Sequence, residues 1–402
     1  YGEEDCSVVA NKISGSVDYK PYLVEDAGGS VNPPWSVGSQ TYECSETCDF
    51  RVRVYTDNTL ATLVSSHFSI QAAIDESTTL DNYFVVVDAS IYDEVVFIDK
   101  PLSLLGPNEN ISAVTGARND EARLKQRIIV TNSAVSDVTI SGFEFFEVPE
   151  VSSNKTIDIN VDSDGFFIEN NRFINCESDA IKTGITSSNA NITVRGNLIQ
   201  GIQDNLGTGI NIGGISGNSV ISDNKIDLVS IGFSGIQTPN ATGLTISNNE
   251  ISNTTNHGLQ IAGISGNVTI ENNTISNTNT TNASDKGAVR LYGTDFIGPI
   301  IVQNNKLTSS FNGVAIKDGQ DISVTNNDVS GNSNFAIYNG ATIGSLDATC
   351  NWYGTEDAST IAASISGNVV FTPFLTVDNT SSGTSYSWDT NNKYSCISEV
   401  SE

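Results

Sequence analysis

Methionine is absent from this 402-residue chain, and histidine and cysteine are scarce. His67 and His257 are the only histidines, and no two of the six cysteines form a C-x-x-C pair. A zinc site of the usual kind is therefore not expected. Because the chain begins at Tyr1 and contains no methionine, we expect it to be a processed product or an excised portion of a longer one.

Basic residues are also few. Lys and Arg number 19 against 47 Asp and Glu, which gives a formal net charge of −28. A nucleic-acid-binding protein needs a basic surface, so this class is not expected. The same charge repels anionic lipids and acidic polysaccharides unless cations or a local basic groove intervene. No apolar run approaches the roughly 18 residues of a membrane span, and no charged-then-apolar leader opens the chain, so no transmembrane segment is predicted.

Cysteines and sequons both favour an extracellular location. The cysteines lie mostly toward the two ends, which suits a few disulfides that staple the termini, with reduced thiols as the alternative. Sequons of the form N-x-S/T permit glycosylation without demonstrating it, because an Asn-, Ser- and Thr-rich chain makes many by chance. The disulfide candidates are Cys6, Cys44, Cys48, Cys176, Cys350 and Cys396. The glycosylation candidates are Asn110, Asn154, Asn191, Asn240, Asn253, Asn267, Asn272, Asn279, Asn282 and Asn379.

A short phrase recurs from about residue 160: apolar, any, Asn or Asp or Gly, Asn, any, apolar. It first reads Ile168–Phe173 and last reads Val324–Val329. A small residue followed by an aliphatic one comes after each phrase, from Ala180-Ile181 to Ala336-Ile337. The second Asn of each phrase is Asn171, Asn197, Asn224, Asn249, Asn273, Asn305 and Asn327.

This repeat predicts a parallel β-helix. The segments alternate apolar with polar residues and are too short for helices, so they are expected to be strands. Asn tolerates the left-handed backbone of a sharp turn, and its amide can bond to the same Asn one rung away. Short strands, tight turns and a period of about two dozen residues fit one rung per period, with an advance of ~4.8 Å per rung.

The segment before the repeat has the features of the start of such a helix. Ser69–Asp75 predicts a short amphipathic helix that caps the open end, which would otherwise be an unpaired sheet edge. Strands are predicted at Phe84–Val87, Glu94–Ile98 and Leu102–Leu105. In the longest step of the repeat, from Asn273 to Asn305, the polar stretch Thr278–Asp285 predicts a loop that bulges from one rung.

The stretch IQAAID…FVVVDASIYDEVVFIDKPLSLLG, followed by the Asn-Asn rungs, resembles the right-handed parallel β-helix of the pectin-lyase-like superfamily. It is similar in particular to simple-repeat members such as NosD-like and archaeal or bacterial cell-surface proteins. The resemblance covers roughly residues 67–376. It implies an all-β, right-handed, single-stranded parallel β-helix. It does not imply one function, because this scaffold carries lyases, hydrolases, esterases, adhesins and structural proteins.

The opening block Tyr1–Val24 is repeated near the other end, from Tyr353 to Thr376, without a gap, and half of its positions are identical. The match extends loosely to Tyr42 and Cys44, which face Tyr394 and Cys396. The block Asn351–Gly354 resembles the ending of β-helical units in surface proteins, so the chain begins with a copy of its own closing module. The residues that mark the two copies are Tyr1, Gly2, Pro21, Trp35, Tyr353, Gly354, Pro373 and Trp388.

The predicted organisation is therefore an N-terminal module at 1–50, a linker and cap at 51–83, a β-helix at 84–352 and a closing module at 353–402. One hypothesis makes the chain one unit of a tandem array. Another places the N-terminal module against a neighbouring subunit, a head-to-tail contact that builds a filament or lattice when it does not close. A duplicated decoration without an assembly role is the third.

The duplication also bears on the cysteines. Cys350 lies just before the closing module and Cys396 inside it, so the two are candidates to pair with one another. Cys44 matches Cys396 and needs Cys6, Cys48 or another chain as its partner. Cys176 lies among the rungs and is expected to be buried.

The sequence matches the catalytic motifs of hydrolases and esterases only in part. Asn256-His257-Gly258 faintly resembles the Gly-His-Gly of polygalacturonase-type hydrolases, but Asp179 and Asp204 are remote. Asp204 lies two rungs before His257, or ~10 Å along the axis, too far for a shared proton. We interpret His257 as a rung-turn residue. Gln203-Asp204 lacks the flanking motif of pectin-methylesterase-like enzymes and is interpreted as structural.

Lyase chemistry would need a basic or Ca²⁺-lined groove. Lys286 and Arg290 are candidates to share a groove, although solvation at the surface is the favoured interpretation. The acidic surplus suits Ca²⁺, but no EF-hand or RTX repeat appears. No catalytic or cofactor-binding residue is predicted, and a metal site stays open.

These observations predict an extracellular structural protein that self-assembles head-to-tail into a surface sheath, S-layer or filament. The predicted partners are copies of itself, with cell-surface glycans as a further candidate. The alternatives are a secreted polysaccharide lyase or hydrolase and a carbohydrate-binding adhesin. We expect a non-enzymatic role.

Overall fold

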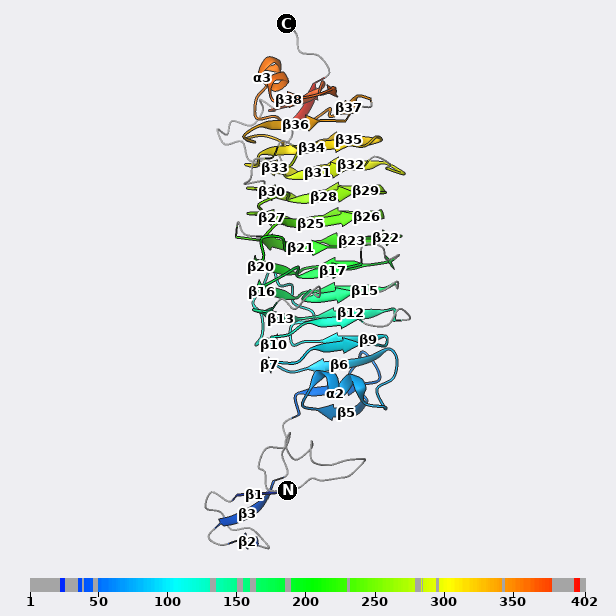
Figure 1. Ribbon diagram of the computed structural model, residues 1–402, viewed down its shortest axis with the longest axis vertical. Helices are drawn as coiled ribbons and strands as arrows, with labels where there is room; N and C mark the ends of the chain where they lie inside the picture. The colour runs from blue at the N-terminus through cyan, green and yellow to red at the C-terminus, as the bar shows by residue number, and fades with distance from the viewer. Residues whose placement is uncertain are drawn as a thin grey trace.

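The computed structural model describes residues 22–25, 35–37, 40–45, 50–130, 135–149, 155–159, 164–184, 189–229, 232–278, 283, 285–293, 296–341, 344–377 and 394–397. Most of them form three long sheets that run side by side along one elongated body (Figure 1). Each rung contributes one strand to each sheet in turn, and neighbouring rungs pair in parallel. The predicted β-helix is confirmed.

Sheet one has 14 strands, and its outermost strands at the N-terminal end are antiparallel. In spatial order they are β39 (Val369–Val370), β37 (Leu346–Asp347), β35 (Ile322–Thr325), β32 (Ile300–Gln303), β29 (Gly266–Glu271), β26 (Thr242–Ser247), β23 (Ser219–Ser222), β19 (Thr193–Arg195), β15 (Phe166–Glu169), β12 (Val138–Ser141), β9 (Leu102–Leu105), β6 (Tyr83–Val87), β4 (Val52–Tyr55) and β5 (Leu63–His67).

Sheet two has nine strands and sheet three has 11. Sheet two comprises β33 (Lys306–Thr308), β30 (Thr274–Ser276), β27 (Glu250–Ser252), β24 (Lys225–Asp227), β20 (Leu198–Ile202), β16 (Arg172–Cys176), β13 (Phe143–Phe146), β10 (Ala122–Leu124) and β7 (Ser90–Tyr92). Sheet three comprises β38 (Ile365–Ser366), β36 (Phe335–Asn339), β34 (Asn312–Asp318), β31 (Val289–Tyr292), β28 (Leu259–Ala262), β25 (Ser234–Pro239), β21 (Thr208–Asn211), β17 (Ile181–Thr183), β14 (Ile157–Ile159), β11 (Ile128–Val130) and β8 (Val96–Ile98).

Smaller groups of elements complete the described chain. The short strands β18 (Asn189–Ala190) and β22 (Ile215–Ser216) pair in parallel. The N-terminal segment holds β1 (Tyr22–Glu25), β2 (Trp35–Val37) and β3 (Gln40–Ser45), and the C-terminal segment holds β40 (Phe374–Val377) and β41 (Tyr394–Ile397). The described residues include two short helices, α2 (Ile70–Asp75) and α3 (Ala358–Ala363).

The interior is built from aliphatic side chains that stack in register from rung to rung. In sheet two, Ile226, Ile251 and Ile275 face one another in successive strands and are buried, while the residues beside them point outward. β-Branched residues fit such a pleated, half-buried surface. Phe145 and Phe173 stack with ring centroids 4.9 Å apart in the N-terminal half of the body. The core is therefore one continuous column.

The predicted Asn ladder is confirmed and extends one rung further, to Asn351. Each amide nitrogen donates to the amide oxygen of the next Asn, at distances of 2.9 to 3.3 Å. The same oxygen also accepts the backbone N–H of the preceding Asn, at 2.9 to 3.1 Å. All of these side chains are buried. The members are Asn171, Asn197, Asn224, Asn249, Asn273, Asn305, Asn327 and Asn351.

The residue before a ladder Asn has a left-handed backbone, as predicted. At Asn170, Asp223 and Asn248, for example, φ lies between 57 and 59°. In the last rung this position is Cys350, with φ of 55°. Cysteine is there subject to the steric penalty that this conformation imposes on side chains other than Asn and Asp.

The small residues that open the sheet-three strands are required by close packing. A Cβ on Gly235 would lie 2.4 Å from Ile251 Cγ2, and one on Gly258 would lie 2.2 Å from Ile275 Cγ2. At these positions the backbone leaves no room for a larger side chain where the chain turns from sheet two into sheet three.

The N-terminal end is closed as predicted by a helix over Ser69–Asp75. The Ser69 hydroxyl accepts the Ala72 N–H, and Glu94 accepts the N–H groups of Ile70 and Gln71 at 2.8 and 2.9 Å. This carboxylate satisfies helix donors that otherwise lack partners. The antiparallel strands β4 and β5 lie in the segment expected to be a linker, so sheet one begins earlier than the sequence indicated.

Candidate docking site at the end of the β-helix

The last rung ends in Cys350, Asn351 and Trp352. Asn351 closes the ladder by accepting from Asn327 and by donating to Val324 O at 2.6 Å. Asp328 forms parallel bridges to Lys306 of β33 and to Trp352, and these bridges extend sheet two by two positions. We call the surface made by β36, β37, Cys350 and Asn351 the end-rung site.

The closing module, from Tyr353 onward, covers this site. Its strands β38 and β39 continue sheets three and one by pairing with β36 and β37. β40 then crosses the end of the ladder, where the Leu375 N–H donates to Asn351 O at 3.0 Å and the Cys350 N–H donates to Pro373 O at 2.6 Å. The stack of parallel strands thus continues into the closing module, beyond the expected boundary at residue 352.

Apolar burial and one close backbone approach hold the closing module in place. Ile361 of α3 and Phe374 of β40 are buried against the core. Gly367 has φ of 90°, and a Cβ there would lie 1.9 Å from Asn339 O in the end-rung site. No residue other than glycine fits this approach without moving the module away from the rung.

The N-terminal strands have the same pairing as the closing module. β1 pairs antiparallel with β3, so that Tyr22 faces Ser45 and Leu23 faces Cys44. β40 pairs antiparallel with β41, so that Phe374 faces Ile397 and Leu375 faces Cys396. The residues of the first pair and their counterparts in the second differ in number by the offset of the sequence repeat. This is the offset that aligns Tyr1 with Tyr353 in sequence.

The N-terminal module retains the residues that contact the end-rung site in the closing module. Gly367 and Leu375 correspond in the repeat to Gly15 and Leu23. The exposed Val370, by contrast, corresponds to Asp18. The identical positions on the site side are Tyr353, Gly354, Ile365, Ser366, Gly367, Val369, Pro373 and Leu375, which match Tyr1, Gly2, Ile13, Ser14, Gly15, Val17, Pro21 and Leu23.

Several predicted module residues lie outside the described side chains. Tyr1, Gly2, Pro21 and Trp388 lie outside the described residues, and of Trp35 only the strand position, opposite Tyr42, is described. The duplication of whole modules therefore stays a prediction, supported by the shared register of the described strands.

The cysteines divide into three groups. Cys350 is disulfide-bonded. Cys176 is a free, buried thiol, as predicted, and burial raises its pKa to about 11, which keeps it protonated and unreactive. Cys44 and Cys396 are placed only through their strands, β3 and β41. Cys6 and Cys48 lie outside the described residues.

Most of the described sequons are structural turns. Asn191, Asn240, Asn253, Asn267 and Asn272 all have φ between 53 and 57°. The turn explains these asparagines without a glycan. Asn110 is exposed in a loop. The candidates Asn154, Asn279, Asn282 and Asn379 lie outside the described residues.

His257 is unsuited to acid–base catalysis. It is 1% exposed, and its Nε2 lies 2.9 Å from the amide nitrogen of Asn256, without a carboxylate partner among its described contacts. Burial, together with the nearby charges of Arg290 and Lys286, lowers its pKa to about 2. A general base works best with a pKa near the operating pH.

The carboxylates of Asp179 and Asp204 accept hydrogen bonds that stabilise the local fold. Asp179 is buried, and its two carboxylate oxygens accept from the Thr208 N–H at 2.6 Å and from Asn211 Nδ2 at 3.1 Å. Burial raises its pKa. Asp204 accepts the Leu206 N–H at 3.0 Å in a tight turn. The Gln203 amide is directed to Asn175, at 3.5 Å.

Arg290 lies on the outer face of β31, between the buried Val289 and Leu291, and the charges of both Arg290 and Lys286 act on the buried His257. A groove shared by Lys286 and Arg290 stays a prediction. Arg290 is 12% exposed, and it pairs with Asp285 at 2.6 Å and donates to Gln260 Oε1 at 2.9 Å. Its guanidinium lies 4.7 Å from the centre of the Tyr292 ring. Interpretation as a solvated surface residue is therefore wrong for Arg290, because its stem and head are packed. The contact between Arg290 and the Tyr292 ring could not be predicted from the spacing of residues in the sequence.

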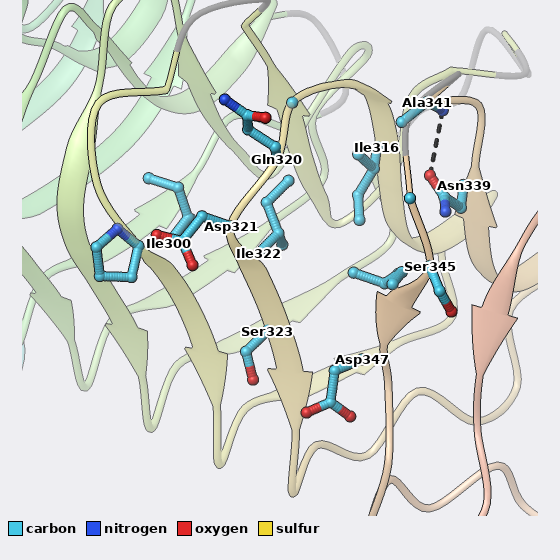
Figure 2. Close-up of a pocket in the computed structure, with 14 residues that line it drawn as sticks. Ile300, Ile316, Gln320, Asp321, Ile322, Ser323, Asn339, Ala341, Ser345 and Asp347 are labelled. Carbon is cyan, nitrogen blue, oxygen red and sulfur yellow. Dashed lines mark hydrogen bonds between the residues drawn. The ribbon is translucent and has the colours of Figure 1, made fainter.

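A pocket of about 500 Å³ lies between sheets three and one near the C-terminal end. Figure 2 shows the aliphatic side chains of Ile316 and Ile322 in this pocket, near Ser323 and Asp347. Two of its polar groups serve the fold: Asp347 accepts the Thr349 N–H at 3.1 Å, and the Asn339 amide oxygen accepts the Ala341 N–H at 3.1 Å. The pocket is also lined by Gln320, Asp321, Ser323 and Ser345.

Metal-ligating side chains do not gather in the part of the chain that the structure describes. No group of three or more His, Cys, Asp or Glu side chains there is placed to hold a metal ion, so Ca²⁺ binding stays untested. Neither described helix has the length or apolar character to cross a membrane.

Comparison with known proteins bears on the architecture. Residues 158–329 match the family model described as the right handed beta helix region. The crystal structure of pectate lyase Pel9A is similar at 10% sequence identity and a TM-score of 0.40, over 77% of this chain and 74% of that chain. No curated protein matches the chain. The family model and the stacked parallel rungs agree on a right-handed parallel β-helix, and a fold alone assigns no activity.

Proposed function

We propose that this right-handed parallel β-helix is an extracellular structural protein that self-assembles head-to-tail. In the assembly, the N-terminal module of one copy docks on the end-rung site of the next. Repetition of this contact gives a filament, and lateral association of filaments gives a sheath or S-layer. The observation that carries the proposal is that the N-terminal module retains Gly15 and Leu23, whose counterparts Gly367 and Leu375 contact the last rung.

The placement of the two modules supports an intermolecular contact. The chain enters the stack at the end covered by α2 and leaves it at the opposite end, so the two modules are tethered to opposite ends (Figure 1). Within one chain, the end-rung site is occupied by the closing module. An N-terminal module with the same contacts fits the same site on another copy, in the manner of a domain swap.

Competition with the resident closing module sets the condition for assembly. The closing module is tethered to its own site at an effective concentration in the millimolar range. An incoming N-terminal module can therefore bind the end-rung site only when the closing module is released. Head-to-tail growth is therefore expected to be slow and conditional. An extracellular location is supported by the disulfide at Cys350, because disulfides persist in oxidising compartments.

Sedimentation velocity of the full chain over a range of concentrations tests the proposal. We expect a concentration-dependent series of oligomers. Gly15→Val should shift this series to monomer, because a side chain at residue 15 would block the close approach that its counterpart Gly367 makes in the closing module. Asp18→Val is the matched control, since the counterpart Val370 is 47% exposed. A wild-type chain that stays monomeric at all concentrations, with and without reductant, would refute the proposal.

A second candidate function is carbohydrate binding along sheet three, with lyase activity as its catalytic form. One polar residue per rung points outward there, in a register that spans five rungs. An evenly spaced polar column fits an extended polymer. The column is Lys182, Asn211, Gln237, Gln260 and Arg290. Binding of uronate polysaccharides that Gln237→Ala weakens, measured by calorimetry with an assay for unsaturated products, separates this candidate from assembly.

A further inference from the structure

Cys350 stands at the centre of the docking contact. Its N–H bonds to Pro373 of the closing module at 2.6 Å, and its sulfur is in a disulfide. Because Cys176 is free, the partner is one of the other four cysteines. Cys396 is the one whose strand position is fixed beside this point, since it faces Leu375, whose N–H bonds to the neighbouring Asn351.

Cys44 occupies the equivalent position in the N-terminal module. It faces Leu23 in the β1–β3 pair, as Cys396 faces Leu375 in the β40–β41 pair. A docked N-terminal module with Leu23 over Asn351 therefore brings Cys44 to the place that Cys396 has in the closed chain. One sulfur atom on Cys350 then serves two mutually exclusive partners.

We propose that Cys350 is a shared disulfide partner that decides which module holds the end-rung site. It pairs with Cys396 of its own chain when the closing module is docked, and with Cys44 of a second copy in the assembled state. This inference rests on the proposed head-to-tail assembly and names its covalent lock.

The exchange is balanced without an added oxidant. The Cys44 thiolate attacks the Cys350 sulfur of the Cys350–Cys396 disulfide, a Cys44–Cys350 bond forms, and Cys396 leaves as a thiolate. Cys350 is half-buried, not enclosed in the core, so an approaching thiolate can reach it. The cysteine count fits this scheme. Once Cys176, Cys350 and Cys396 are assigned, three cysteines remain, and an odd number leaves one for a bond between chains.

Isotope mixing distinguishes bonds within a chain from bonds between chains. Equal amounts of unlabelled and ¹⁵N-labelled full-length chain are incubated in a glutathione redox buffer, and oligomers are separated by size. Each fraction is alkylated, digested without reduction and mapped by mass spectrometry. We expect Cys350–Cys396 peptides in the monomer, and Cys44–Cys350 peptides in the oligomers with about half of them containing one labelled and one unlabelled strand.

Variants separate the lock from the assembly. Cys44→Ser should remove the hybrid peptides and the reductant-sensitive oligomers, whereas Cys176→Ala, at a buried free thiol, should leave both in place. Oligomers without any Cys44–Cys350 bond, or a monomer in which Cys350 pairs with a cysteine other than Cys396, would overturn the lock while head-to-tail assembly stands. Absence of oligomers in every redox buffer would overturn both.

Discussion

Removal of one amide from the middle of the Asn ladder tests whether the ladder holds the rungs together. Asn249 lies between Asn224 and Asn273 and is 1% exposed. In the wild-type chain, Asn249 Oδ1 accepts the backbone N–H of Asn224 at 3.1 Å and the Asn224 side-chain amide at 3.0 Å. In Asn249→Ala, both of these donors lose their acceptor. Ile221 O also loses a donor.

The expected cost follows from the orphaned donors. A buried polar group that loses its partner costs about 1–3 kcal/mol, so two such donors give a loss of about 2–6 kcal/mol in the free energy of unfolding. Because each rung contacts only its neighbours, the loss should be concentrated locally. The peptides that contain residues 221–251 should exchange backbone hydrogen faster than distant rungs.

Urea unfolding gives the global loss, and native-state hydrogen exchange by mass spectrometry locates it. The control is Asn248→Gly, one residue away on the exposed side of the same turn, where φ of 57° suits glycine. It should change stability by less than about 0.5 kcal/mol. A loss below about 1 kcal/mol in Asn249→Ala, or equal losses in the two variants, would refute the ladder's role.

Three further predictions follow from the described geometry. Because His257 has a pKa of about 2 in the folded chain and an ordinary value of 6.5 when unfolded, the unfolded state alone takes up its proton as the pH falls below 6.5. Stability should therefore fall by about 2 kcal/mol between pH 6.5 and pH 4.5 on this account, and His257→Gln should lack that share in pH-dependent unfolding. Gly235→Ala should cost about 1–3 kcal/mol through overpacking, because its Cβ would meet Ile251 at 2.4 Å, and an unchanged urea midpoint would contradict this. In a glycosylating host, glycopeptide mapping should find higher occupancy at the exposed Asn267 and Asn272 than at Asn253, whose amide nitrogen donates to Asp227 at 2.8 Å, and the reverse order would argue against this interpretation of the turns.

The rungs could be predicted from sequence because every rung has the same structural requirements. A left-handed turn, an amide ladder and a small residue are needed once per rung, so each leaves a periodic mark. Cys350 shows the limit of this rule, because it occupies a turn position where Asn, Asp or Gly stands elsewhere. The strands β4 and β5 occur once, in an antiparallel cap, and left no repeating signal.

The candidate sites were less predictable because they depend on register between rungs of unequal length. The outward column of sheet three pairs Lys182 with Asn211, and it pairs Gln260 with Arg290 across a stretch of chain of different length. No fixed spacing in the sequence reveals such a column. The close approach of Gly367 to Asn339 gives a physical reason for glycine in the closing module, and Gly15 is the match of Gly367 in the sequence repeat.

Electron microscopy of the full-length chain tests the central claim most directly. In a redox buffer that permits disulfide exchange, the account predicts end-to-end filaments one β-helix wide, whose number falls sharply in Gly15→Val and stays unchanged in Asp18→Val. Single rods at every concentration and redox potential, or filaments that Gly15→Val leaves intact, would contradict head-to-tail docking on the end-rung site.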